Sequence, residues 1–271
     1  MALPTIKLDR GIHVTHLFYR INRAAWQSLL PGQSAEIRDR LQTLCNRYNH
    51  PCQPRLCSYA NSGGKADLAF IIYAADLVEL ERIRHEVETS FPPGILATVF
   101  TYLSVTELSE YTTTEEESRQ TLIQQEKLDP ESETFKKRIE EVRERLAKYE
   151  HYRLYPEMQD WELMGFYPMN KRRAPGENWY VLDFPTRKKL MAGHARVGRK
   201  YAGRISQLIT GSTGLDDWEW GVTLMAHQAD ALKEIVYEMR FDEVSARYGE
   251  FGPFYVNLRL APADLWSFLG L

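Results

Sequence analysis

The sequence contains no long apolar run. No stretch approaches the roughly 18 consecutive apolar residues that a membrane-spanning helix needs. Residues 1–7 also hold no apolar segment of the kind that a secretory leader carries. From these two absences we expect a cytoplasmic protein that is not inserted in a membrane.

Cysteine is scarce as well. The three cysteines are an odd number in 271 residues, which excludes a disulfide framework. Cys45, Cys52 and Cys57 flank His50, and thiolates and imidazole are ligands that zinc takes. The spacing lacks a Cys-x-x-Cys knuckle, so we expect buried, reduced thiols, with a zinc site as the alternative.

An excess of positive charge is missing too. Against 34 Lys and Arg stand 37 Asp and Glu, a net charge of -3, whereas a nucleic-acid surface usually makes a domain basic. We therefore expect no nucleic-acid partner, and any bound anion must be held by locally gathered cations. Hydrophobic residues at 44% and charged residues at 26% are ordinary for a globular chain with a real core.

The chain has two halves with the same order of elements. We expect the first half to form its strands and helices at residues 13–21, 34–47, 55–59, 66–74, 77–88 and 95–111. The second half follows at 162–171, 185–201, 204–210, 218–226, 229–240 and 252–260, with a short extended piece at 179–182. Each half is βαββαβ, the ferredoxin-like order. The predicted fold is α+β, two tandem ferredoxin-like modules that form a dimeric α+β-barrel type body with helices outside.

The segment between the halves, residues 112–150, is highly charged. Apolar side chains recur there on one narrow helical stripe, at Phe135, Ile139, Val142, Leu146 and Tyr149. This pattern predicts a helical connector that lies across the body. The chain then divides into an N-terminal module at 8–111, the connector at 112–150 and a C-terminal module at 151–271.

Three chemically unlike side chains share one face of the strand that opens the second half. Side chains alternate between faces along a strand, so Tyr167, Met169 and Lys171 point the same way. A phenol, a thioether and an ammonium together are an odd choice for a purely apolar core. Their alignment favours a functional site.

The helix that follows places a histidine among apolar neighbours. Leu190, His194 and Val197 recur at i, i+4 and i+7, which turns the histidine inward. It is either a satisfied core residue or an axial ligand of heme iron, for which neutral imidazole is the common choice. On the next strand the Gln207 amide lies between two isoleucines and must find hydrogen-bond partners. It is either a structural bridge or an uncharged group above a bound ligand.

Motifs of the second half resemble those of a known family. The motifs, in order, are Tyr167-Pro-Met-Asn-Lys-Arg-Arg173, Asn178-Trp-Tyr180, His194, Gly198-Arg-Lys-Tyr-Ala-Gly-Arg204, Gln207-Leu-Ile-Thr-Gly-Ser-Thr-Gly-Leu-Asp-Asp-Trp-Glu-Trp-Gly221, Val236-Tyr-Glu-Met-Arg-Phe-Asp-Glu-Val-Ser-Ala-Arg-Tyr248 and Glu250-Phe-Gly-Pro-Phe-Tyr255. They resemble the coproheme decarboxylase branch of the chlorite dismutase superfamily. The match is dense from about residue 153 to 255, and over 1–111 it is mainly one of layout.

The resemblance implies that the C-terminal module is catalytic and binds heme and coproheme. It also assigns roles to residues of that module. His194 resembles the proximal iron ligand, Tyr167 the tyrosine whose radical attacks the propionates, and Lys171 the lysine beside the reacting propionate. The implied pocket residues are Gln207 on the distal side, Arg153, Arg240 and Ser245 as propionate anchors, and Met169 and Trp179 as neighbours.

The implied activity is the hydrogen peroxide-dependent oxidative decarboxylation of two propionates of Fe-coproporphyrin III (coproheme) to vinyl groups. Coproheme is then both substrate and its own redox cofactor, and heme b is the product. Arg153, Lys171 and Arg240 would supply the local cations that such an anion needs. The resemblance further implies a homopentamer and a transient contact with a coproporphyrin ferrochelatase.

Three other functions remain open. A chlorite dismutase on the same fold would convert chlorite to chloride and oxygen, but that branch carries a distal arginine where Gln207 stands. A non-enzymatic heme carrier or sensor would need His194 and have no use for Tyr167. A cofactor-free monooxygenase of the wider α+β-barrel group would take up no iron porphyrin.

Overall fold

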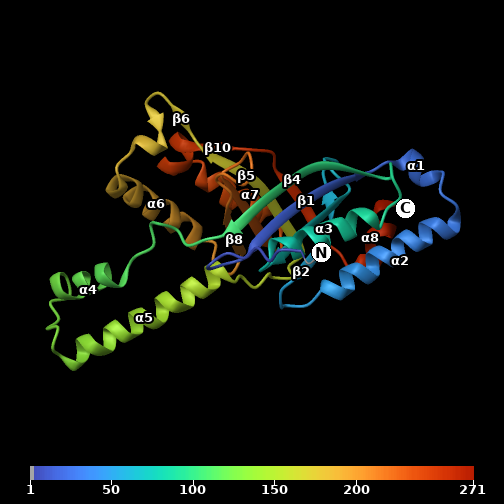
Figure 1. Cartoon of the computed structure of the whole chain (residues 1–271). Helices are drawn as coiled ribbons and strands as arrows, with labels where there is room; N and C mark the ends of the chain where they lie inside the picture. Colours follow the sequence, from blue (N-terminus) through green and yellow to red (C-terminus); the bar gives the residue numbers. More distant parts are fainter. Residues whose placement is uncertain (1–2) are drawn as a thin grey trace.

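The computed structural model describes residues 3–271. Its main feature is a nine-stranded antiparallel sheet of order β10-β5-β11-β2-β3-β1-β4-β8-β9, in which β9 also pairs with β5 (Figure 1). The strands are β1 (His13–Ile21), β2 (Arg55–Ser62), β3 (Leu68–Ala74), β4 (Leu96–Thr106), β5 (Leu163–Lys171), β8 (Ile205–Gly211), β9 (Trp220–Ala226), β10 (Gly249–Phe251) and β11 (Tyr255–Arg259). Because the order returns to β5, the sheet closes on itself as a barrel.

The helices lie outside this barrel. They are α1 (Arg23–Gln27), α2 (Pro31–Tyr48), α3 (Leu77–Thr89), α4 (Glu115–Gln124), α5 (Glu133–Leu154), α6 (Phe184–Arg199), α7 (Ala229–Met239) and α8 (Pro262–Leu269). Short elements complete the chain: the two-stranded β6 (Arg173–Ala174) and β7 (Glu177–Asn178), the 3-10 turn η1 (Trp179–Val181) and the π-helical turn η2 (Val244–Tyr248). None of the helices in residues 3–271 is long and apolar enough to cross a membrane.

Each half of the barrel repeats one strand order. The first module runs β2-β3-β1-β4 and the second β8-β9-β5-β11, and they join where β4 meets β8 and β11 meets β2. The predicted pair of ferredoxin-like modules forming one barrel-like body is thus confirmed. Since only Val105 and Thr106 of β4 pair with β8, most of that edge of β8 is left for other elements to cover.

Three hydrophobic clusters follow from this geometry. Alternate strand residues such as Phe18, Phe166 and Tyr255 fill the barrel interior. The outer face of the first module packs against α2, α3 and α8, whereas the outer face of the second module packs against α7. Figure 1 shows α2, α3 and α8 at one end of the molecule and α6 and α7 at the other.

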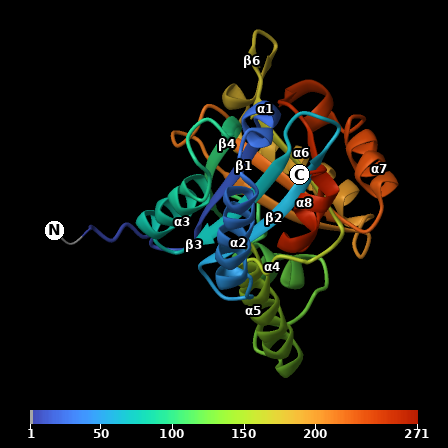
Figure 2. The ribbon, with the colours of Figure 1, turned by 90° about the vertical axis from the view of Figure 1, so that its right-hand side faces the viewer.

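The connector differs from its prediction. α4 and α5 form a helical hairpin that projects from the barrel instead of lying across it (Figures 1 and 2). The reason is that Leu122 of α4 covers the predicted stripe at Phe135 and Ile139, so the stripe is buried without the sheet. Farther along, Tyr149 is exposed.

Several element boundaries also differ from the sequence expectations. The strand expected at 95–111 ends at Thr106, and the piece expected to be extended at 179–182 forms η1. α1 and α8 were not expected at all. α8 falls within the predicted C-terminal module, yet its Leu265 and Trp266 pack into the core of the first module. The three domain limits stay a prediction.

The cysteines form no cluster. Cys45 and Cys57 are buried, as expected, but Cys52 is exposed, which corrects that part of the prediction. Cys52 follows α2 in the loop that precedes β2, and loops run over the surface. Within the described range no three His, Cys, Asp or Glu side chains are placed to hold a metal ion, so the alternative zinc site gains no support.

Candidate functional site

The site begins on the outer face of β5. Tyr167 is 5% exposed, and its ring stacks on Phe254 at 4.5 Å and lies 5.7 Å from Phe251. Burial raises the pKa of the Tyr167 phenol well above its ordinary value; the nearby Arg240 opposes this rise and Asp242 adds to it. The phenol therefore keeps its proton at neutral pH.

Lys171, at the end of the same strand, is held under an aromatic ring. Its side chain is 8% exposed, and Nζ lies 4.8 Å from the centre of the Trp179 ring. Burial lowers the pKa of Lys171 to about 8, although the charges of Asp242 and Glu219 act in the opposite direction. Glu219 also accepts a 2.8 Å hydrogen bond from the Lys171 backbone N–H, which fixes the end of the strand.

His194 lies on α6, a helix whose start is capped by Asp183 through a 2.7 Å bond from the Thr186 N–H. Its Nδ1 is 2.9 Å from Oδ2 of Asp242. Because a carboxylate only accepts hydrogen bonds, Nδ1 carries the hydrogen and Nε2 of the neutral ring keeps its lone pair. A histidine held in this way is the usual form of a metal ligand.

Asp242 is the centre of a small network. Oδ2 also accepts a 2.9 Å bond from the Ser245 hydroxyl, and Oδ1 accepts the backbone N–H groups of Val244 and Ser245 at 3.0 and 3.2 Å. Burial works to raise the pKa of Asp242, but the bonds from His194 and Ser245 outweigh it and the pKa lies below its ordinary value. Asp242 therefore stays charged and orients His194.

The inner face of α6 is not sealed by protein. No residue of α6 is buried, and Leu190, Met191 and Val197 beside His194 are only half-buried. The helix packs closely on the sheet at Gly198, where an added Cβ would lie 3.4 Å from Gln207 Nε2. Part of the apolar surface of α6 beside His194 is thus exposed.

Cations lie around this open surface. The Arg240 guanidinium stands 3.9 Å from the centre of the Phe251 ring. With Arg172 and Ser245 it lines a pocket of about 530 Å³ whose walls include Phe251 and Phe254. The Ser245 hydroxyl donates its hydrogen to Asp242, so in this arrangement it has none left to donate to a propionate, as the predicted anchor would have to.

Arg153 reaches the site from another element. It stands in the last turn of α5, and its Nη2 donates a 3.4 Å bond to the Ile209 carbonyl, while Tyr152 donates at 3.3 Å to the Gln207 carbonyl. α5 thereby covers the edge of β8 that β4 leaves unpaired. Arg153 Nε is buried and has no hydrogen-bond partner within residues 3–271.

The structure thus brings together most of the predicted site. Tyr167, Met169 and Lys171 share the outer side of the second module with His194 and Arg240, whereas Arg153 makes its contacts on the β8 flank. Sequence reasoning assigned no role to Asp242, Phe251, Phe254 or Glu219. An Asp followed three residues later by Ser is a common turn or cap pattern, so this spacing alone could not identify Asp242.

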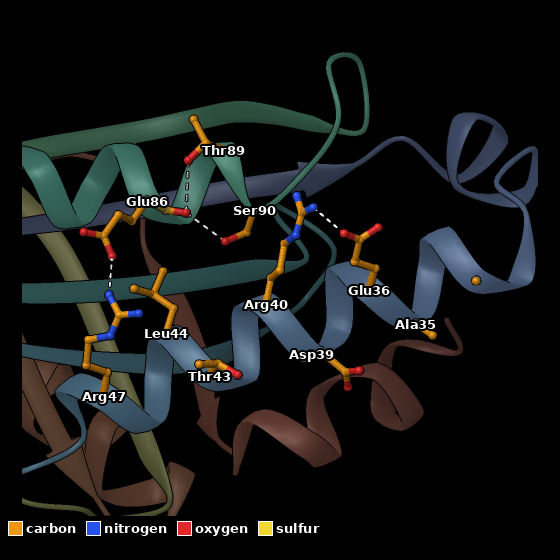
Figure 3. Close-up of a pocket in the computed structure, with 11 residues that line it drawn as sticks. Ala35, Glu36, Asp39, Arg40, Thr43, Leu44, Arg47, Glu86, Thr89 and Ser90 are labelled. Atoms are coloured by element: carbon orange, nitrogen blue, oxygen red, sulfur yellow. Dashed lines mark hydrogen bonds and ion pairs between the residues drawn. The ribbon is translucent and has the colours of Figure 1, made fainter.

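A second hollow, of about 630 Å³, lies between α2 and α3 (Figure 3). Both cations of its lining are paired: Arg40 contacts Glu36, and Arg47 lies 3.0 Å from Glu86. The Ser90 hydroxyl donates to the Glu86 carbonyl at 2.8 Å. Within residues 3–271 the hollow has no aromatic residue in its lining and both of its cations are paired, so the face of the second module is the better candidate site.

Comparison with known proteins gives consistent matches. A family model described as chlorite dismutase matches residues 34–260. A protein of Halobacterium salinarum whose name describes it as heme-binding is 38% identical over 99% of this chain. The chain spans about half, 51%, of that relative's length.

Solved structures agree on the fold. A protein of Thermus thermophilus described as a heme-binding protein is 37% identical, with a TM-score of 0.79 and coverage of 99% of this chain and 98% of that one. A variant of the chlorite dismutase of Candidatus Nitrospira defluvii gives a TM-score of 0.70 over 97% of both chains. Its identity is 16%, so that likeness concerns the fold alone.

Proposed function

The chain belongs to the chlorite dismutase family, and we propose that its second module binds coproheme and converts it to heme b with hydrogen peroxide. Two relatives that are more than a third identical to this chain are described as heme-binding proteins. The observation that carries the decarboxylase proposal is the buried phenol of Tyr167, which lies beside cationic groups on the face that His194 also borders.

The residues present fit an iron porphyrin. The half-open inner face of α6 offers apolar surface for a flat ring, and Nε2 of His194 is the atom suited to iron. Coproheme carries four propionates, and Arg172 and Arg240 stand at the adjoining pocket. The buried Nε of Arg153 lacks a partner within residues 3–271, and a carboxylate would satisfy it.

The proposed reaction balances for each propionate. The group –CH2–CH2–COO⁻, one hydrogen peroxide and one proton give –CH=CH2, carbon dioxide and two waters. The propionate loses two electrons, which reduce the peroxide, and the bond to the carboxyl carbon breaks. When bound, the iron would supply the redox chemistry with peroxide, and two such cycles would give heme b.

Tyr167 would supply the hydroxyl hydrogen that moves in this reaction, and Lys171 the positive charge that holds the carboxylate. Tyr167 keeps its hydroxyl hydrogen at neutral pH because burial raises its pKa, so the phenol gives up a proton and an electron together and can then take a hydrogen atom from the propionate. Lys171 stands at the same face with a pKa of about 8 and is mostly cationic at pH 7. It would orient the carboxylate until carbon dioxide leaves.

The test follows the products. Ferric coproheme is added to the parent protein, peroxide is titrated, and mass spectrometry should find two successive losses of carbon dioxide plus two hydrogens. Tyr167→Phe should bind coproheme with unchanged affinity but form vinyl groups at least 100-fold more slowly, about 3 kcal/mol in the barrier. Conversion at the parent rate by Tyr167→Phe would disprove this mechanism.

The same titration distinguishes the alternatives. A heme carrier would bind the porphyrin and release no carbon dioxide, a chlorite dismutase would evolve oxygen from chlorite, and a cofactor-free monooxygenase would bind no iron porphyrin. The uncharged Gln207 against α6 favours decarboxylation over chlorite chemistry. From the resemblance we also infer a cytoplasmic homopentamer with a transient coproporphyrin ferrochelatase contact, and light scattering tests the oligomer.

A further inference from the structure

The outer side of α6 carries an excess of positive charge. The helix and its C-cap contain six cationic side chains and no acidic one, namely Arg187, Lys188, Lys189, Arg196, Arg199 and Lys200. The whole chain has a net charge of -3. The excess is therefore a local property of this helix and does not follow from overall composition.

Three other helices, α2, α3 and α5, hold ion pairs within the helix. α2 pairs Arg40 with Glu36, and α3 pairs Arg84 with Glu88 at 2.8 Å, one turn apart. Such pairs stabilise a helix. Within the described chain α6 has no intrahelical pair of this kind, although none of its residues is buried in the core. The cations of α6 therefore either contact acids of other segments or face solvent.

Three of these cations form one solvent-facing row. Lys189, Arg196 and Arg199 are exposed and recur at i, i+7 and i+10, on the side of α6 opposite His194. We call these three residues the basic stripe. Across residues 3–271 none of them has a carboxylate within 4.0 Å, whereas the other three cations of α6 contact acids of neighbouring segments.

We propose that the basic stripe attracts the tetra-anionic porphyrin substrate and steers it toward the open inner face of the same helix. This inference rests on the proposed function. Positive charge beside a binding site raises the rate of encounter with an anion over a range set by the salt concentration. The stripe faces away from the inner surface, so it would act on association and leave the bound complex unchanged.

A small soluble anion fits this surface better than a lipid bilayer does. Ala192 and Ala195 stand between the cations of the stripe, and both are exposed. A helix that binds membranes needs bulky apolar side chains next to its basic ones. Between residues 189 and 199 α6 has no exposed bulky apolar side chain, and Phe184, which is 42% exposed, lies at the first position of the helix, before the stripe. This composition suits a ligand that passes over the surface.

The experiment measures association of iron-free coproporphyrin III by stopped-flow fluorescence. The stripe variant is Lys189→Gln, Arg196→Gln and Arg199→Gln. The matched control is Lys137→Gln, Arg145→Gln and Lys148→Gln, which removes as many exposed, unpaired cations from α5. Because iron-free porphyrin undergoes no turnover, binding is read without activity.

We expect the stripe variant to associate about tenfold more slowly than the parent at roughly 0.01 M salt, where the screening length is about 30 Å. Near 1 M salt, with a screening length of about 3 Å, the difference should vanish. The control variant should associate at nearly the parent rate, and the dissociation rate should be the same in all three proteins.

Equal slowing in the control, or a salt-independent difference, would overturn the steering role and leave the proposed function intact. Failure of the parent itself to bind this probe would overturn the steering role, and failure to bind ferric coproheme as well would overturn the proposed substrate. Stripe-dependent binding to phosphatidylglycerol vesicles, with porphyrin association unchanged, would reassign the surface to a membrane and reject the proposal.

Discussion

At the scale of single residues, burial lowers the pKa of Lys171, and the neighbouring carboxylates act to raise it. Its pKa is about 8 in the folded chain against an ordinary value of 10.5. Below pH 8 the folded protein carries a buried ammonium that the unfolded chain would solvate. As the pH rises from 8 toward 10.5 the folded state loses that proton first, so the destabilisation is relieved.

Lys171→Met should therefore stabilise the ligand-free protein by about 3 kcal/mol at pH 7. The gain should fall below about 1 kcal/mol near pH 10, because the parent lysine is then neutral when folded. Urea unfolding of the parent and of Lys171→Met at pH 7 and pH 10 measures this gain. The exposed Lys137→Met serves as the control and should show no such trend; a gain that did not change with pH would contradict the buried ammonium.

Asp242 is a positioning residue for His194. Asp242→Asn keeps an oxygen for the backbone N–H groups of Val244 and Ser245 but removes the charge opposite Nδ1. In the ferrous porphyrin complex we expect the iron–histidine stretching frequency to fall, because the ring loses electron density. Ser245→Ala leaves the carboxylate in place and should shift the frequency less. An unchanged frequency in Asp242→Asn would rule out this role.

At the scale of elements, the two glycines of α6 have different surroundings. A Cβ added at Gly193 would meet no atom within 4 Å, whereas at Gly198 it would lie 3.3 Å from Met239 Cε and 3.4 Å from Gln207 Nε2. The close approach at Gly198 brings α6 against β8 and α7. Around His194 the apolar side chains of α6 remain half-buried.

This difference predicts unequal effects on stability for the same substitution at the two glycines. Gly193→Ala should raise the free energy of unfolding by roughly 0.5–1 kcal/mol, since alanine reduces the backbone entropy of the unfolded chain. Gly198→Ala should bring no gain, because Met239 and Gln207 must move. Urea midpoints of both variants compare them. Equal gains would mean that α6 does not pack closely at Gly198.

At the scale of the whole molecule, the barrel and α8 connect the modules. The strands of both modules share one interior cluster, and α8, at the end of the chain, covers the first module. Trp266 is 4% exposed and stacks on Trp26 at 5.3 Å. The two modules should therefore unfold as one cooperative unit.

Trp266→Ala should cost roughly 3–5 kcal/mol of stability, the usual effect of removing a buried aromatic ring. Phe268, on the same helix, is 52% exposed, and Phe268→Ala should change stability by less than about 0.5 kcal/mol. Far-ultraviolet circular dichroism reports the helices and porphyrin binding reports the site. In Trp266→Ala the unfolding transition seen by circular dichroism and the loss of porphyrin binding should shift to lower denaturant concentration together. Porphyrin binding that survived unfolding of the first module would show that the modules are independent.

Much of the fold could be read from local patterns. Alternation and helical periodicity depend only on residues near in sequence, so the repeated βαββαβ order was predictable. So was the common face of Tyr167, Met169 and Lys171, because strand geometry determines it. The inward position of His194 followed from the stripe on its helix.

Contacts between distant segments required the tertiary structure. Asp242 comes within 2.9 Å of His194 only because η2 packs beside α6, and Phe254 reaches Tyr167 from a loop between strands. The apolar stripe of α5 could pack on any apolar surface, and the structure provides α4. An amphipathic pattern states that a face must be buried, while the chain topology decides which partner buries it.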